Sequence, residues 1–361
     1  MKLVIIGAGA IGLLLYQQLN TTLKKPNQLA LLTRTANKNS NAPLSYHDID
    51  DHEQKININY ANLTDLQYAD VVIVCVKAFH VNDVITHYQE DINPQASIVL
   101  CHNGMGVFEE LPQDLTNRQP LCALLTTHGS RKDSAMAITH TGNGVYALRC
   151  LNSELDRLNL SIKNLFMNSL ANCTFHQDIR LKQWQKLAVN CVINPITAIN
   201  KIPNGDILNK CYSVLRRQLI EEFVAIAELA GISFDVNEVN ETVEHVAIST
   251  AKNTSSMLSD VLANRKTEIT YINGFLLEVA GKYNQLELAK THQAIYQLDV
   301  KRSLSNNCFA VFCFDSIFCV WVAFLLFGPL TTCVVFKLLT AISSGKLSCS
   351  LATLSNCFLV A

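Results

Sequence analysis

The fold is decided by the first stretch of the chain, Leu3-Val4-Ile5-Ile6-Gly7-Ala8-Gly9-Ala10-Ile11-Gly12. Its apolar run, bounded by glycine, predicts a strand buried on both faces of a parallel sheet. The glycines have the spacing G-x-G-x-x-G and open a helix expected over residues 10–23. The first permits a tight turn, the second lets a pyrophosphate approach the backbone, and the third allows close helix packing. The stretch predicts a dinucleotide site, and the alternative is a strand-to-helix turn without a ligand.

Alternating apolar runs and helical segments continue to about residue 151. Because this alternation is typical of doubly wound α/β sheets, we expect a Rossmann-type domain over residues 1–151, with room for antiparallel pairing among its later strands. The expected strands after the first are Gln28–Thr33, Asp70–Val76, Ser97–His102, Leu121–Thr127 and Gly144–Leu148.

From about residue 152 apolar residues recur at three- and four-residue spacing, as in amphipathic helices. We therefore expect an all-helical C-terminal domain over residues 152–302, with a substrate site in the cleft between the two domains. The expected helices are Leu181–Ala198, Asp206–Ala230, Glu238–Lys252 and Leu258–Tyr283.

Charge and cysteine usage narrow the class of protein. The formal net charge of the 361 residues is -1, which provides no basic surface for nucleic acid. The cysteines show no paired spacing typical of zinc sites or disulfide frameworks, so they indicate buried thiols in a reducing compartment. We expect a cytoplasmic protein; the alternative, that the apolar start is a secretory signal, fits the glycine spacing poorly.

The last segment, residues 303–361, departs from the helical pattern. It holds six of the thirteen cysteines, and Ser316–Phe336 has no charged residue and is long enough to span a bilayer. Three interpretations compete: a membrane anchor, a buried hydrophobic extension, and a non-native tail from a shifted or run-on reading frame. We favour the third, because the segment lacks both helical amphipathicity and flanking basic clusters.

Residues at the ends of the expected strands indicate which dinucleotide binds. The second strand ends in Thr33-Arg34-Thr35 without the acid that an NAD site generally has, and a guanidinium can hold the extra phosphate of NADP. Lys77 could neutralise cofactor phosphate or polarise substrate, and Asn103 could bridge cofactor and substrate. There are alternatives to these binding roles. Arg34 could be an ordinary solvated residue, and Asn103-Gly104 could simply form a turn. We interpret His128, at another strand end, as structural.

A polar row lies in the apolar stretch Trp184–Pro195. Lys186, Asn190 and Asn194 fall on one face of the expected helix, and burying them is unfavourable unless a polar group docks there. The lysine is a candidate proton donor, which with a nicotinamide cofactor suggests carbonyl reduction. The alternative is a lysine that snorkels at a domain surface. Glu268, in an expected apolar helix, is either a structural carboxylate or a site residue.

Several motifs taken together closely resemble the ketopantoate reductase (2-dehydropantoate 2-reductase) family over about residues 1–302. They are the glycine stretch of residues 7–12, Val76-Lys77-Ala78, His102-Asn103-Gly104-Met105-Gly106, Trp184–Pro195, Pro203-Asn204-Gly205, Ser255-Ser256-Met257 and Thr267-Glu268-Ile269.

The resemblance implies roles for individual residues. Lys186 is implied to be the proton donor, and Glu268 to sit against the cofactor and that lysine. The residues implied to hold substrate are Asn103, Asn190, Asn194, Asn204 and Ser256. NADPH as reductant and a role in pantothenate and coenzyme A synthesis are implied as well.

The sequence differs from the usual pattern of the family in two places. Residues 283–290 lack the glycine and proline that usually precede the last helix, and residues after about 303 have no counterpart. The leading interpretation is a cytoplasmic NADPH-dependent reductase of ketopantoate, a small-molecule substrate. The rivals are a reductase of another branched 2-keto acid, and a dinucleotide-binding regulatory or membrane-tethered protein.

Overall fold

The structure, a computed structural model, describes residues 1–23, 27–34, 43–152 and 156–305. Residues 1–303 form one unit and residues 304–361 another. Among the described helices, none is both long and apolar enough to cross a membrane. The segment 316–336 lies outside the described residues, so the three interpretations of the tail stay open.

A seven-stranded sheet forms the N-terminal part, in the order β11-β10-β7-β6-β5-β1-β2. The strands from β7 to β2 pair in parallel, whereas β10 runs antiparallel to β7. This confirms the Rossmann-type α/β fold and the expected antiparallel pairing among the later strands. The strand bounds are β1 (Leu3–Ile6), β2 (Leu29–Leu32), β5 (Val71–Val74), β6 (Ser97–Leu100), β7 (Leu121–Thr126), β10 (Tyr146–Cys150) and β11 (Cys173–Phe175).

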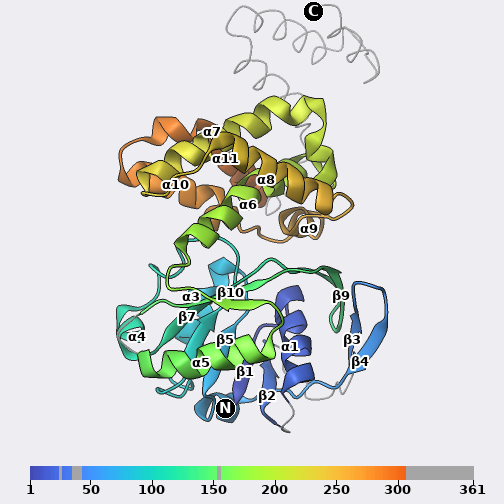
Figure 1. Cartoon of the computed structure of the whole chain (residues 1–361), viewed down its shortest axis with the longest axis vertical. Coiled ribbons are helices and arrows are strands. Elements are labelled where there is room, and N and C mark those ends of the chain that lie inside the picture. Colours follow the sequence, from blue (N-terminus) through green and yellow to red (C-terminus); the bar gives the residue numbers. More distant parts are fainter. Residues whose placement is uncertain (24–26, 35–42, 153–155, 306–361) are drawn as a thin grey trace, which may run out of the picture. The chain divides into compact units, whose positions relative to one another are not determined.

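Each face of this sheet has its own core, which explains why β1 is apolar throughout. Leu3 and Ile5 pack with the leucines of α1 (Ala10–Thr22) and with α5 (Asp156–Ser169). Val4 and Ile6 pack on the opposite face with α3 (Ala78–Tyr88) and α4 (Gln113–Arg118). Side chains of a strand alternate between faces, so only a continuous apolar run fills both cores. Figure 1 shows the helices on the two sides of the sheet.

A second, four-stranded sheet was not predicted. Its order is β4-β3-β9-β8, with β3 (Leu44–His47), β4 (Glu53–Ile56), β8 (Gly129–Ser134) and β9 (Ala137–Gly142). Leu44, Tyr46 and Ile138 attach it to the core around α1. The strands escaped sequence analysis because β4 and β8 are mostly polar and exposed, so they lack an apolar run. A short helix, α2 (Leu63–Gln67), precedes β5.

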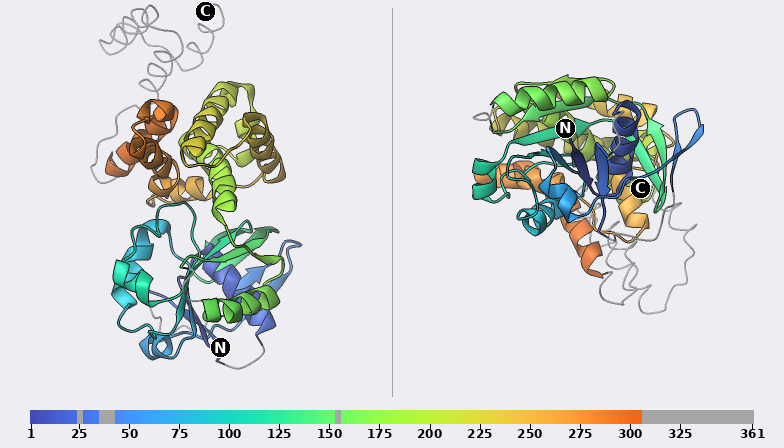
Figure 2. Two further views of the ribbon diagram at one scale, coloured as in Figure 1. Left: turned by 60° about the vertical axis from the view of Figure 1, so that its left-hand side comes forward. Right: turned by 90° about the horizontal axis from the view of Figure 1, so that it is seen from below.

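The C-terminal part is helical, as expected, and packs around a separate core of buried residues (Figure 2). Its α-helices are α6 (Arg180–Asn200), α7 (Ser213–Leu229), α8 (Val236–Ser249), α9 (Ser256–Leu262), α10 (Asn273–Lys282) and α11 (Lys290–Ser305). Short 3₁₀ turns connect them: η2 (Asn204–Leu208), η3 (Lys210–Tyr212), η4 (Ile269–Tyr271) and η5 (Leu286–Ala289).

Three boundaries differ from the expectation. The helix expected over residues 206–230 begins only at Ser213, because the chain forms two 3₁₀ turns first. The helix expected over residues 258–283 is two helices, separated after Leu262 by a segment in which Asn264 is left-handed at φ 50°. The sheet also continues past residue 151, because β11 pairs with β10 and extends the α/β part to Phe175.

A buried histidine makes the helical core sensitive to acid. The side chain of His292 lies within hydrogen-bond distance of Asn273 Nδ2 at 2.9 Å and Leu219 O at 3.0 Å. Burial lowers its pKa from 6.5 to about 4. The unfolded chain therefore takes up a proton as the pH falls below 6.5, whereas the folded chain does not, and stability decreases with falling pH.

Because of His292, we expect the free energy of unfolding to decrease by about 2 kcal/mol as the pH falls from ~7 to ~4.5. Urea unfolding over this range measures the loss, and His292→Asn should flatten the pH dependence by that amount. His245, exposed on α8, provides the control: His245→Asn should leave the slope unchanged. If the free energy of unfolding changes equally with pH in the parent and in His292→Asn, the prediction is wrong.

Candidate active site

Lys186 projects from α6 to the carboxyl edge of the N-terminal sheet. Its Nζ donates to Asn103 Oδ1 and to the Thr126 carbonyl, both at 2.8 Å. Asn103 follows β6, and Thr126 is the last residue of β7. Burial lowers the pKa of Lys186, although the charges of Cys101 and Glu268 oppose this effect. The ammonium is thus made more acidic at the sheet edge where ligands bind in α/β folds.

The rest of the polar row extends from this lysine along α6. Asn190 and Lys186 line a small, narrow pocket together with His102, Gly104, Met105, Leu125, Gln183 and Leu187. Asn194 lies one turn further along and is buried, with 7% of its surface exposed. The expected row is therefore present, and its first two members share one pocket with residues that follow β6.

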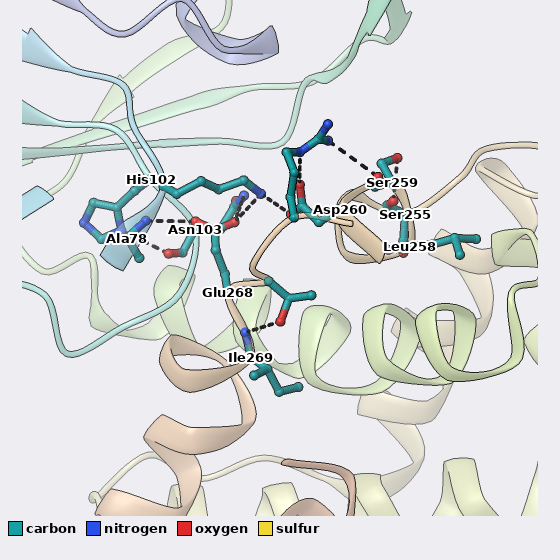
Figure 3. A network of polar contacts seen from close by, with 12 residues as sticks. Ala78, His102, Asn103, Ser255, Leu258, Ser259, Asp260, Glu268 and Ile269 are labelled. Carbon is teal, nitrogen blue, oxygen red and sulfur yellow. Dashed lines mark hydrogen bonds and ion pairs between the residues drawn. The ribbon is translucent and has the colours of Figure 1, made fainter. Parts of the chain in front are cut away.

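Glu268 is the centre of a buried polar network (Figure 3). Its Oε2 accepts from Lys77 Nζ at 3.0 Å and from Asn103 Nδ2 at 3.4 Å, and its Oε1 accepts from the backbone N–H of Ala78. The carboxylate lies just before η4 and not in a helix, which corrects the sequence interpretation of its local structure. Glu268 and Lys186 thus share Asn103 as a common hydrogen-bond partner.

Lys77 is held between two buried carboxylates. Its Nζ lies 2.7 Å from Asp260 Oδ2 as well as 3.0 Å from Glu268 Oε2. Burial alone would lower the pKa of Lys77, but the two carboxylates outweigh it and raise the pKa. Asp260, 2% exposed, was missed in the sequence because a single acid in α9 gives no signal before its partner is known.

The glycine-rich turn has the geometry that the motif predicts. Gly7 adopts φ +115°, and a Cβ there would lie 2.4 Å from the Cys75 carbonyl oxygen. A Cβ on Gly12 would lie 2.1 Å from the Gly7 carbonyl oxygen, so a side chain at either position is excluded. A Cβ on Gly9 would lie 4.0 Å from its nearest neighbour, the Cys75 carbonyl oxygen, so this position is not crowded. The backbone is thus accessible at the start of α1, where a pyrophosphate can approach.

Arg34 is the exposed residue two positions after the end of β2. Residues 35–42 lie outside the described part of the chain, so the surroundings of Arg34 are described only on its N-terminal side. The position corresponds to the sequence expectation, whereas its role in phosphate recognition stays a prediction.

The serine and asparagine of the later motifs differ in their surroundings. Ser255 caps α9, since its Oγ accepts from the backbone N–H of Leu258, and it lies 2.7 Å from Thr197 Oγ1. Ser256 next to it is exposed and is available to a ligand. Asn204 is 8% exposed, and its Oδ1 has no hydrogen-bond partner among the described residues. A buried acceptor without a donor is unfavourable, and the role of Asn204 in holding substrate stays a prediction.

His128 belongs to a hydrogen-bonded histidine pair. Its Nδ1 lies 3.1 Å from His140 Nε2 and accepts from the Gly144 backbone N–H, and His140 Nδ1 lies 3.3 Å from the Tyr46 hydroxyl. Burial, followed by the charge of His140, lowers the pKa of His128 to about 4. These contacts join the two sheets through neutral rings, in keeping with the structural role expected for His128.

The fold and the site together define a class of protein. A Rossmann-type sheet with an accessible glycine turn, joined to helices that bring an acidic lysine to the sheet edge, is the arrangement of a dinucleotide-dependent oxidoreductase. Two family models match the chain: "Ketopantoate reductase PanE/ApbA" over residues 3–153 and its C-terminal counterpart over residues 178–301. The chain therefore belongs to the ketopantoate reductase PanE/ApbA family.

Individual relatives agree with this assignment. The chain is 32% identical to 2-dehydropantoate 2-reductase of Vibrio cholerae, over 82% of this chain and 96% of the relative. It is 34% identical to the enzyme of the same name from Shigella flexneri, over 78% of this chain and 88% of the relative. Among solved structures, a dimeric ketopantoate reductase from Staphylococcus aureus covers 84% of this chain and 99% of its own, with 24% identity and a TM-score of 0.70.

Proposed function

We propose that the protein reduces 2-dehydropantoate (ketopantoate) to pantoate with NADPH, as a step of pantothenate and coenzyme A synthesis. The observation that carries the proposal is the Lys186 ammonium, 2.8 Å from both Asn103 Oδ1 and the Thr126 carbonyl, beside the pocket lined by Asn190. We assign the cofactor to the α/β part and most substrate contacts to the helical part. We also assign the enzyme to the cytoplasm, because its buried thiols suit a reducing compartment.

In the proposed reaction a bound NADPH would supply the hydride that adds to the keto carbon. The carbonyl oxygen gains the electron pair of the broken C=O π bond, and Lys186 gives it a proton, so the product is a neutral hydroxyl. Asn103 and the Thr126 carbonyl hold the ammonium in place. A lysine with its ordinary pKa is a weak acid at neutral pH, so the lowering of its pKa by burial favours this transfer.

The remaining polar residues suit the substrate's hydroxyl and carboxylate. We assign these contacts to Asn190, Asn194, Ser256 and Asn204, whose Oδ1 has no hydrogen-bond partner among the described residues. Glu268 we assign to the cofactor side, because it fixes Asn103 from the side opposite to Lys186.

One assay tests the proposal against its rivals. Purified protein is supplied with NADPH and either 2-dehydropantoate or other branched 2-keto acids, and oxidation of NADPH is followed. We expect the highest kcat/KM with 2-dehydropantoate. A higher value with another 2-keto acid would assign that substrate, and nucleotide binding without turnover on any of them would favour a regulatory protein.

Arg34 should set the preference for NADPH over NADH. A charge-assisted bidentate contact to the extra phosphate is worth about 1.5–3 kcal/mol, so Arg34→Ala should lower the NADPH-to-NADH preference by roughly ten- to a hundredfold. The ratio of kcat/KM values for the two nucleotides measures the effect. Arg217→Ala, which removes an exposed guanidinium from α7, is the control. An unchanged ratio in Arg34→Ala would assign phosphate recognition to another residue.

A further inference from the structure

The unpredicted strand β8 lies against the glycine-rich turn. Lys132 Nζ donates to the Ala8 carbonyl at 2.5 Å, and Ser130 Oγ donates to the Ala10 carbonyl at 3.3 Å. Both acceptors belong to the turn of residues 7–12 that opens α1. An ammonium is thus held at the turn where the exposed Gly9 leaves the backbone accessible to a pyrophosphate.

A second cation, Arg265, shares the carboxylate of Asp260 with Lys77, which lies two residues after Cys75, whose carbonyl oxygen borders Gly7. Arg265 follows α9, and its Nε donates to Asp260 Oδ1 at 3.1 Å while its side chain is 60% exposed. In keeping with this position, burial lowers the pKa of Lys132, and the charge of Arg265 lowers it further. Within the described residues no carboxylate lies within ion-pair distance of Lys132.

Two neighbouring cations of which one lacks a carboxylate form an unfavourable arrangement that an anion would relieve. The first turn of α1 carries no acid, so its N–H groups add further attraction for negative charge. Lys77, by contrast, is neutralised by Asp260 and Glu268. Among the described residues at the turn, the cation without a carboxylate partner is therefore Lys132 on β8, while Arg265 shares Asp260 with Lys77.

We propose that Lys132 and Arg265 form a pyrophosphate clamp, one cation from each part of the chain, that holds the diphosphate of the dinucleotide against the glycine-rich turn. The clamp rests on the proposed function, since it presupposes that a dinucleotide binds there. It makes a distinct prediction, because the diphosphate is common to NADPH and NADH. Loss of a clamp residue weakens both nucleotides alike, whereas loss of Arg34 changes their ratio.

The test measures Kd for NADPH and for NADH by calorimetry on the full chain, with Lys132→Gln. Because the variant loses a charge-assisted contact to phosphate, we expect its Kd to rise at least about tenfold, and equally for the two nucleotides. Arg131→Gln is the matched control: it removes the same charge from the adjacent residue of β8, which pairs with Asp133 at 2.7 Å and not with the turn. We expect Arg131→Gln to change either Kd by less than about twofold.

Arg265→Gln tests the second half of the clamp. Because Arg265 also contacts Asp260, a purely structural role would lower thermal stability without selective loss of nucleotide. We expect Arg265→Gln to weaken both nucleotides by about tenfold or more, with Arg265→Lys restoring part of the affinity. Lys132→Gln binding both nucleotides as tightly as the parent overturns the clamp, as does a loss confined to NADPH. A parent protein that binds neither nucleotide overturns the proposed function and the clamp with it.

Discussion

Lys186→Ala is expected to lower kcat about a hundredfold or more while leaving the Kd for NADPH nearly unchanged. Loss of a general acid typically reduces the rate by 10² to 10⁴. The ammonium donates to Asn103 Oδ1 and to the Thr126 carbonyl, so it faces the pocket that Asn190 lines. In the proposed reaction, its removal takes away the proton that would neutralise the alkoxide formed by hydride transfer. Steady-state turnover and nucleotide titration measure the two quantities separately.

The control for this variant is Lys182→Ala, which removes an exposed lysine one turn earlier on α6. Its kcat should stay within about twofold of the parent. The pH profile adds a second readout: because the acid must be protonated, kcat should fall as the pH rises through the lowered pKa of Lys186, below its ordinary value of 10.5. Turnover of Lys186→Ala within threefold of the parent would remove Lys186 from the catalytic role.

The parts of the fold that the sequence predicted are those encoded by local patterns. The apolar run of residues 3–6 and the glycine spacing after it depend on neighbouring residues only, and β1 and the Gly7 turn follow both. The polar row on α6 was also readable, since helical periodicity alone puts Lys186 and Asn190 on one face. The small second sheet was not, because the polar strand β8 is stabilised by pairing with β9 and by contacts with a turn 120 residues earlier in the chain.

The prediction of one helix over residues 258–283 was wrong for the same reason, and this error lies within the candidate site. Its apolar spacing favours one continuous helix, yet the chain breaks after Leu262 and turns again at Ile269. Asp260 on α9 and Glu268 after the break both contact Lys77, the residue before α3, at 2.7 Å and 3.0 Å. Two acids and a lysine that are 183 and 191 residues apart carry no signal in a single sequence. The ion pairs thus accompany a break in the helix that apolar spacing alone does not predict.

Lys77→Met is expected to destabilise the folded protein by about 3–5 kcal/mol near neutral pH, the usual loss when one partner of a buried ion pair is removed. Asp260 and Glu268, with side chains 3% and 4% exposed, would then lose the ammonium between them, and only Asp260 would keep a cation, Arg265 at 3.1 Å. Like charges at short distance in a buried site raise the carboxyl pKa, so one of the two should take up a proton in the folded state. A raised pKa in the folded state contributes stability at low pH and loses it as the pH rises. The destabilisation relative to the parent should therefore shrink at about pH 5.

Urea unfolding of parent and variant at both pH values measures this difference, and the histidine contributions cancel because both proteins retain them. Lys266→Met is the matched control: it removes a neighbouring exposed lysine that lies 4.6 Å from the Phe79 ring centroid. It should change stability by no more than about 1 kcal/mol at either pH. A loss below about 1 kcal/mol in Lys77→Met, or a loss that does not vary with pH, would mean that the two carboxylates do not depend on this lysine. The Lys77 ammonium would then not be the group that holds Glu268 in the candidate active site.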